Sequence, residues 1–135
     1  MELAVGQCLI QLAKAEGAKC ILATAGSDEK TKLCEELGAT RGINYKTSDW
    51  GEQVKSLAPE GVDFIVDFIM GLYIPPIIRE LILGQGYLEK DLQVCAGDAT
   101  IVCLATLGGK IINNFDAGAI LYKRLTVPPS SSSEY

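Results

Sequence analysis

Apolar and polar positions along the chain follow two spacings in turn, and the alternation predicts the secondary structure. One apolar stripe at helical spacing predicts a helix, whereas a short, nearly continuous apolar run predicts a strand buried on both faces. Helices are expected at 1–18, 28–37, 49–58, 76–83 and 87–95, with a short one after Asp116. Strands are expected at 19–25, 41–45, 62–68, 100–105 and 125–127.

Capping residues define the ends of two of these helices. Ser27 is a natural N-cap, Asp28 and Glu29 suit the positive end of the helix that follows it, and Gly38 suits its C-terminal end. Ser48 is expected to cap the next helix.

Strands that alternate with helices indicate βαβ crossovers, because parallel neighbours require a long connection. The sequence therefore predicts one α/β domain over 1–127, a doubly wound parallel sheet, followed by a disordered serine-rich tail over 128–135. Ligands of such sheets bind beyond the carboxyl ends of the strands. The segments after Ala25, Tyr45, Phe68 and Ala105 are therefore the candidates for a binding site.

Composition and charge narrow the classes of function. The chain has 135 residues, of which 48% are apolar and 21% charged, as in a folded domain. Its net charge of -5 disfavours nucleic acid as a partner, and no apolar run reaches the roughly 18 residues of a membrane span. The absence of histidine excludes Ser-His-Asp and Cys-His catalysis and an HExxH zinc site.

The five cysteines form no CxxC pair, so their spacing fits neither a zinc ribbon nor a disulfide framework. We expect them to be buried thiols in a reducing compartment, which makes the cytoplasm the expected location.

The order of the motifs resembles the cofactor-binding domain of the medium-chain dehydrogenase/reductase superfamily, in its zinc-free, NADPH-dependent quinone oxidoreductase branch. The resemblance runs from 4 to 127. It is carried by the blocks VGQCLIQLAKAEGAKCILATAGSDEKTKLCEELGA, GINYKTSDW, GVDFIVDFI and GYLEKDLQVCAGDATIVCLATLGGKIINNFDAGAILYKRLTV. It implies a Rossmann-like fold that binds NADP(H).

The chain departs from that family in three places. The family's first strand and most of its glycine-rich loop are absent, so the sheet is expected to lack its first strand, and only Gly6 of the loop glycines remains. Residues 71–85 have no counterpart and are expected to be an insertion. The chain also ends before the family's last segments. It therefore looks like a truncated domain, and we expect it to have negligible reductase activity alone.

The resemblance implies that Ser27, Lys30 and Tyr45 hold the 2'-phosphate of NADP(H). The residues agree with this role, because the strand that ends at Ala25 has no acid at its tip to repel that phosphate. Local sequence alone favours an ordinary role for each residue, namely an N-cap, a solvated charge and a strand-end anchor. The family order shifts the balance toward the phosphate site.

The resemblance also implies contacts with the rest of the cofactor: one glycine near the pyrophosphate and three residues beside the nicotinamide. Gly6, at the start of the first helix, would let the pyrophosphate approach the helix N-terminus, although it also fits a glycine near a frayed end. Phe68, Leu104 and Thr106 would flank the nicotinamide, mainly through their backbone.

Other chemistry finds little support in the sequence. No tyrosine stands in a Tyr-x-x-x-Lys pattern, and the missing acid also argues against a methyltransferase. Asp63 and Asp67 would face the same side of one strand but about 13 Å apart, too far to share a proton. We expect both to be structural carboxylates bound by backbone N–H groups.

Two functions remain open. The first is the NADP(H)-binding domain of an enzyme that passes a hydride from NADPH to a quinone or an activated alkene. The second is a non-catalytic remnant that acts by self-association, as a homo-oligomer, or by pairing with a full-length relative. The apolar residues of 74–82 would supply its contact surface.

Overall fold

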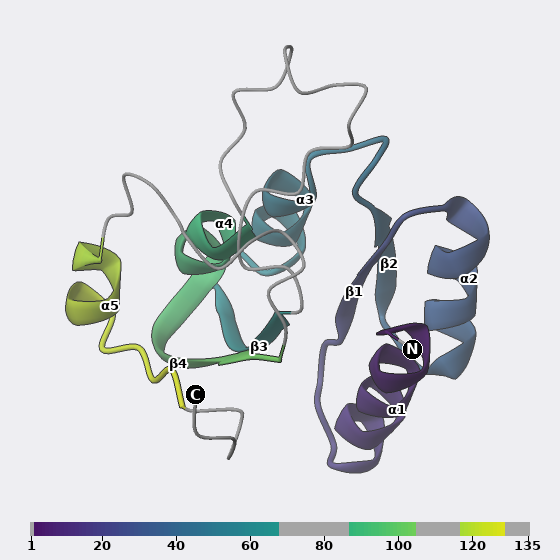
Figure 1. Cartoon of the computed structure of the whole chain (residues 1–135), viewed down its shortest axis with the longest axis horizontal. Helices are drawn as coiled ribbons and strands as arrows, with labels where there is room; N and C mark the ends of the chain where they lie inside the picture. Colours follow the sequence, from purple (N-terminus) through teal and green to yellow (C-terminus); the bar gives the residue numbers. More distant parts are fainter. Residues whose placement is uncertain (1, 68–86, 105–116, 129–135) are drawn as a thin grey trace, which may run out of the picture. The chain divides into compact units, whose positions relative to one another are not determined.

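The computed structural model describes residues 2–67, 87–104 and 117–128 (Figure 1). They form two compact units, which divide after Leu57. The first unit contains α1 (Glu2–Ala15), β1 (Leu22–Ala25), α2 (Asp28–Leu37), β2 (Arg41–Asn44) and α3 (Trp50–Leu57). The second contains β3 (Val62–Asp67), α4 (Tyr87–Val94), β4 (Cys95–Cys103) and α5 (Gly118–Tyr122).

Strands β1 and β2 of the first unit are parallel, in a register that pairs Leu22 with Arg41 and Ala25 with Asn44. Helix α2 is the crossover that parallel neighbours need. Ile10 of α1 and Cys34 of α2 are buried in one cluster together with Ala39. The two helices therefore share a core with the start of the sheet, and the predicted α/β class with parallel strands is confirmed.

The predicted ends of α2 are confirmed. Ser27 has extended backbone, and its Oγ accepts a hydrogen bond of 3.3 Å from the Lys30 N–H. Gly38 ends the helix with a φ of +122°, a conformation that residues with a side chain rarely adopt.

The predicted cap of α3 was wrong by one residue. The helix starts at Trp50, and the Asp49 carboxylate accepts hydrogen bonds from the backbone N–H groups of Gly51 and Glu52, at 2.9 and 3.2 Å. Ser48 instead donates its hydroxyl to the Asn44 carbonyl at 2.9 Å. Both residues are good caps, and the tight turn after β2 occupies the serine.

In the second unit β3 and β4 are parallel, with Phe64 opposite Thr100 and Asp67 opposite Cys103. Helix α4 covers the pair (Figure 1), and its Leu88 and Leu92 pack on Ile101 in the core of this unit. The helix ends at Val94 and β4 begins at once at Cys95, earlier than the sequence predicted. The predicted strand over 125–127 is a single bridge between Thr126 and Thr100.

Several predictions fall outside the described residues. They are the helix over 76–83, the insertion at 71–85 with its apolar contact surface, the cap at Asp116 and most of the tail over 128–135. They stay predictions. In the described residues, no helix is long and apolar enough to cross a membrane.

One lysine connects α5 to the end of α4. The Lys123 ammonium donates hydrogen bonds to the carbonyls of Leu92, Gln93 and Cys95, at 2.6, 3.3 and 2.9 Å. The last carbonyls of a helix lack partners within it and carry partial negative charge. Lys123 therefore acts as a side-chain cap for α4.

Replacing Lys123 by methionine keeps the apolar stem and removes this cap. We expect Lys123→Met to lower the free energy of unfolding by about 1.5 kcal/mol, the typical worth of hydrogen bonds from a charged donor. Urea unfolding followed by circular dichroism measures it. Lys32→Met, on the exposed side of α2, is the control. Equal unfolding midpoints for the two variants would contradict the capping role.

Candidate functional site

The carboxyl ends of β1 and β2 lie side by side and place their following residues together. The pairing continues one step past the strands, because the Tyr45 N–H donates to the Ala25 carbonyl at 3.1 Å. A Cβ atom added to Gly26 would lie 2.7 Å from the Tyr45 hydroxyl oxygen and 3.3 Å from Cε of Lys46. Both side chains therefore pass close over Gly26, where only a glycine leaves them room.

Ser27 and Lys30 join this cluster through the first turn of α2. The hydroxyl of Ser27 accepts from the Lys30 N–H and keeps its own proton for another acceptor. The Lys30 side chain is exposed and makes no ion pair with any described residue. We call Gly26, Ser27, Lys30, Tyr45 and Lys46 the strand-end cluster.

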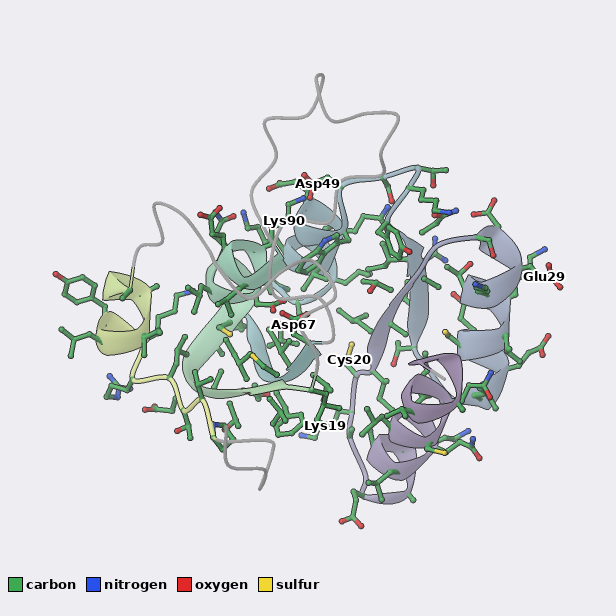
Figure 2. The ribbon with its side chains drawn as sticks, viewed as in Figure 1. Lys19, Cys20, Glu29, Asp49, Asp67 and Lys90 are labelled. Carbon is green, nitrogen blue, oxygen red and sulfur yellow. The ribbon has the colours of Figure 1, made fainter. Side chains whose placement is uncertain are left out.

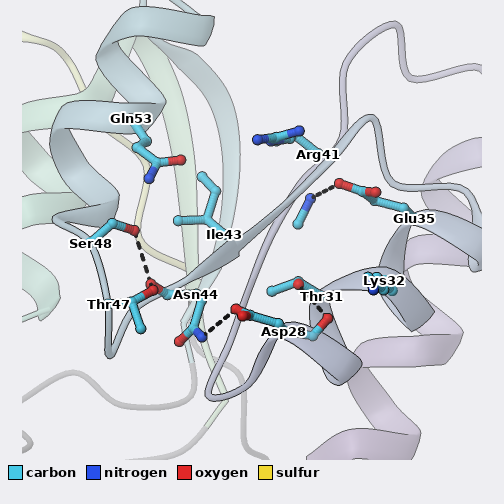
Figure 3. A pocket seen from close by; sticks show the side chains of 11 residues that line it. Asp28, Thr31, Lys32, Glu35, Arg41, Ile43, Asn44, Thr47, Ser48 and Gln53 are labelled. Atoms are coloured by element: carbon cyan, nitrogen blue, oxygen red, sulfur yellow. Dashed lines mark hydrogen bonds between the residues drawn. The ribbon is translucent and has the colours of Figure 1, made fainter.

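Asn44 holds the two halves of the strand-end cluster together (Figure 3). Its side-chain Nδ2 donates to Asp28 Oδ1 at 2.7 Å, and its Oδ1 accepts from the Lys46 N–H at 3.1 Å. The start of α2 is thereby joined to the turn after β2. This bond also engages the carboxylate of Asp28, the nearest acid to Ser27 along the chain.

The sequence reasoning missed Asn44 and Lys46. Each adjoins a residue that it had selected, Tyr45, and this adjacency was the available signal. Their roles depend on contacts with Gly26 and Asp28, which are far away along the chain.

A pocket of about 430 Å³ lies next to this cluster, between α2, β2 and the start of α3 (Figure 3). Its lining mixes charges of both signs, with Lys32 and Arg41 against Asp28 and Glu35. The Glu35 carboxylate also accepts from the Gly42 N–H at 2.9 Å, which covers the edge of β2. Ser27, Lys30 and Tyr45 do not line the pocket, so it is separate from the predicted phosphate site.

Gly6 does not stand at a helix start. Helix α1 begins at Glu2, so Gly6 lies in its second turn, beyond the first four N–H groups that a helix leaves unbonded. The expectation that Gly6 stands at the N-terminus of the first helix, beside its unbonded N–H groups, was therefore wrong. Among the described residues, no atom lies within 4 Å of a Cβ added at Gly6.

Of the three residues expected beside the nicotinamide, only Leu104 is described. Its N–H donates to the Asp67 carbonyl at 2.8 Å, which extends the β3–β4 pairing past the end of β4. Its side chain is exposed. Phe68 and Thr106 lie outside the described residues and stay predictions.

Asp67 lies at the end of β3 (Figure 2). It interacts with a second acid, Asp91 of α4. The two residues are only 4% and 3% exposed, and Asp91 Oδ2 has no hydrogen-bond partner among the described residues. Burial raises the pKa of Asp91 to about 9, and the charge of Asp67 and a hydrogen bond with it add to the shift. Asp91 is therefore a protonated acid at neutral pH.

The sequence-based interpretation of Asp63 and Asp67 did not include this partner. Asp63 is exposed, whereas Asp67 pairs with an acid from another element. Bonding of the two carboxylates to backbone N–H groups stays a prediction. One signal was present in the sequence: Asp91 lies three residues after Leu88 and one before Leu92, on the apolar stripe of its helix.

The expectation that all cysteines are buried holds only in part. Cys8 and Cys20 are exposed, Cys34 and Cys95 are buried, and all five are free thiols. Burial, aided by the Asp91 charge, raises the pKa of Cys95 to about 11. Burial and the charges of both acids raise the pKa of Cys103 to about 11 as well. These two thiols are protonated at neutral pH and are poor nucleophiles.

The buried acid makes stability depend on pH. Between about pH 4 and pH 9 the folded chain keeps the Asp91 proton and the unfolded chain does not, so the free energy of unfolding falls as pH rises. The loss is at most about 1.4 kcal/mol per pH unit. Asp91→Asn keeps a hydrogen-bond donor and has no proton to lose, so we expect it to gain stability relative to the natural chain from pH 5 to pH 8.

Urea unfolding at several pH values measures this difference. Asp63→Asn, which removes an exposed acid of β3, is the control and should keep the pH dependence of the natural chain. Parallel curves for Asp91→Asn and the natural chain would contradict the assignment of the buried proton to Asp91.

Residues 4–134 match the sequence profile of the zinc-binding dehydrogenases. The chain belongs to this family. The family is part of the medium-chain dehydrogenase/reductase superfamily, so the resemblance seen in the sequence is confirmed at that level. Zinc does not fit the described residues, because no three of their cysteines and acids are placed to hold a metal ion.

Individual relatives agree with this assignment. The NADP-dependent oxidoreductase RED1 of Cochliobolus heterostrophus is 42% identical over 69 residues, which are 50% of this chain and 19% of that protein. The chain thus matches about a fifth of the length of the curated relatives.

Solved structures share the fold. The NADPH complex of Escherichia coli quinone oxidoreductase has a TM-score of 0.69 at 25% identity, covering 94% of this chain and 35% of that one. An NAD-dependent alcohol dehydrogenase has a TM-score of 0.70 at 27% identity, covering 90% and 31%.

Proposed function

We propose that this chain is an NADP(H)-binding domain, in which Ser27, Lys30 and Tyr45 receive the 2'-phosphate. The observation that carries the proposal is the strand-end cluster. The Tyr45 hydroxyl lies over Gly26, Ser27 follows Gly26, and Lys30, which has no ion pair among the described residues, stands in the first turn of α2. These groups follow the carboxyl ends of paired parallel strands, where α/β proteins bind their ligands.

The charges around the cluster favour NADP(H) over NAD(H). An NAD-specific site of this kind has an acid at the tip of the strand, which accepts hydrogen bonds from the ribose and repels a 2'-phosphate. Here β1 ends at Ala25, followed by Gly26 and Ser27. The Asp28 carboxylate, one residue further, accepts a hydrogen bond from Asn44. Lys30 then adds a positive charge for the phosphate.

The similar proteins include users of both NADP(H) and NAD(H), so they support NADP(H) without excluding NAD(H). One relative is named as NADP-dependent, and one similar structure is an NADPH complex of a quinone oxidoreductase. A third protein of equal structural similarity is NAD-dependent, so the fold alone does not select the cofactor. The residues at the end of β1 are what favours NADP(H) in this proposal.

In the complete enzyme the cofactor would supply a hydride to a quinone or an activated alkene. The residues of this chain would bind and orient it. As the family resemblance implies, Gly6 is proposed for the pyrophosphate and the backbone of Leu104 for the nicotinamide. Phe68 and Thr106 are proposed for the same side.

Fluorescence titration with NADPH and with NADH tests the cofactor preference. We expect the chain to bind NADPH more tightly than NADH. Lys30→Ala should weaken NADPH binding about tenfold, since the loss of one charged contact is worth about 1.4 kcal/mol, and should leave NADH binding unchanged.

Lys32→Ala is the matched control, because Lys32 stands on the same helix but lines the neighbouring pocket. Equal affinity for the two cofactors in the natural chain, or equal losses in the two lysine variants, would refute the proposed site.

A further inference from the structure

Lys46 occupies a defined position in the strand-end cluster, although its side chain is exposed. Its N–H is bonded to Asn44 Oδ1 at 3.1 Å, and Asn44 is in turn bonded to Asp28 at the start of α2. The turn after β2 is thereby fixed. From this turn the stem of Lys46 passes over Gly26, within 3.3 Å of the place of a Cβ atom.

The charge of Lys46 has no partner among the described residues. In the part of the chain that the structure describes, Lys46 makes no ion pair and no side-chain hydrogen bond. Two other exposed cations, Lys55 and Arg124, pair with acids at 3.1 and 2.7 Å. Lys46 is therefore available for an anion at Gly26.

We propose that Lys46 is a second cation for the 2'-phosphate and a determinant of cofactor specificity. This inference rests on the proposed function. Lys30 approaches from the first turn of α2, and Lys46 from the turn after β2, on the other strand of the pair. The hydroxyls of Ser27 and Tyr45 belong to the same two segments.

The charge of the ligand matches two cations better than one. A phosphate monoester carries about 1.5 to 2 negative charges at pH 7. NADH has a neutral ribose hydroxyl in place of the 2'-phosphate, so the Lys46 ammonium has no charge to attract there. Lys46 should therefore act on NADPH and not on NADH, whereas a lysine that only supports the fold would affect both.

Isothermal titration of the chain with NADPH and NADH tests the inference. Lys46→Ala should raise the Kd for NADPH about tenfold and change that for NADH less than twofold. Salt screens attraction between exposed charges, so the Kd for NADPH should rise with salt concentration. Lys46→Ala should weaken that salt dependence, and Lys46→Arg should restore both the affinity and the salt dependence.

Gly26→Ala provides an independent variant. The backbone of Gly26 has no positive φ, so alanine meets only the steric obstacle of Tyr45 and Lys46. The added methyl group should displace both side chains and lower the preference for NADPH. Lys55→Ala, in the exposed pair with Glu52 on α3, is the control that should change neither cofactor's affinity.

The outcomes separate the two proposals. If Lys30→Ala abolishes the preference for NADPH and Lys46→Ala behaves like the control, Lys46 has no such role and the proposed function stands. If Lys46→Ala weakens both cofactors equally, the inference is also overturned. If the natural chain binds both cofactors equally, or neither, the proposed function fails and the inference fails with it.

Discussion

The parallel pairing of β1 with β2 is the constraint on which the candidate site depends. The pairing extends to the hydrogen bond from the Tyr45 N–H to the Ala25 carbonyl, so that the two strands end at the same level. Without this register Tyr45 and Lys46 would not reach Gly26. The crossover helix α2 begins immediately after the first strand, which places its capped N-terminus and Lys30 at the same level.

The second unit satisfies a different constraint. Two acids are buried between β3 and α4, where the charged form of either is costly without a partner. The pair remains acceptable because Asp91 keeps its proton and hydrogen-bonds with Asp67. The backbone carbonyl of Asp67 also accepts the hydrogen bond from the Leu104 N–H.

The features that the sequence predicted well are those encoded by neighbouring residues. The caps of α2, Ser27 and Gly38, are such features, as is the alternation of strands and helices. The cap of α3 was misplaced because Ser48 and Asp49 are both good caps, and only the turn after β2 decides between them. Gly6 was misplaced because the helix begins earlier than the family pattern implied.

Contacts between distant segments were beyond the sequence. The role of Lys46 depends on Gly26, which follows the neighbouring strand β1, and that of Asp91 depends on Asp67, which ends β3. Each contact depends on strand register or helix packing, which an isolated motif does not specify. The family resemblance supplied Ser27, Lys30 and Tyr45, and the register of β1 and β2 explains how Ser27 and Tyr45 come together.

The most direct test of the proposed site is to map where a 2'-phosphate binds to the chain. Amide NMR spectra of the chain, recorded during titration with adenosine 2',5'-bisphosphate and with adenosine 5'-monophosphate, provide that map. We expect the bisphosphate to shift the amide signals of the strand-end cluster most, and the monophosphate to shift them much less. The cluster consists of Gly26, Ser27, Lys30, Tyr45 and Lys46. Equal shifts with both ligands, or shifts centred on Glu35 and Arg41 in the neighbouring pocket, would contradict the proposed phosphate site.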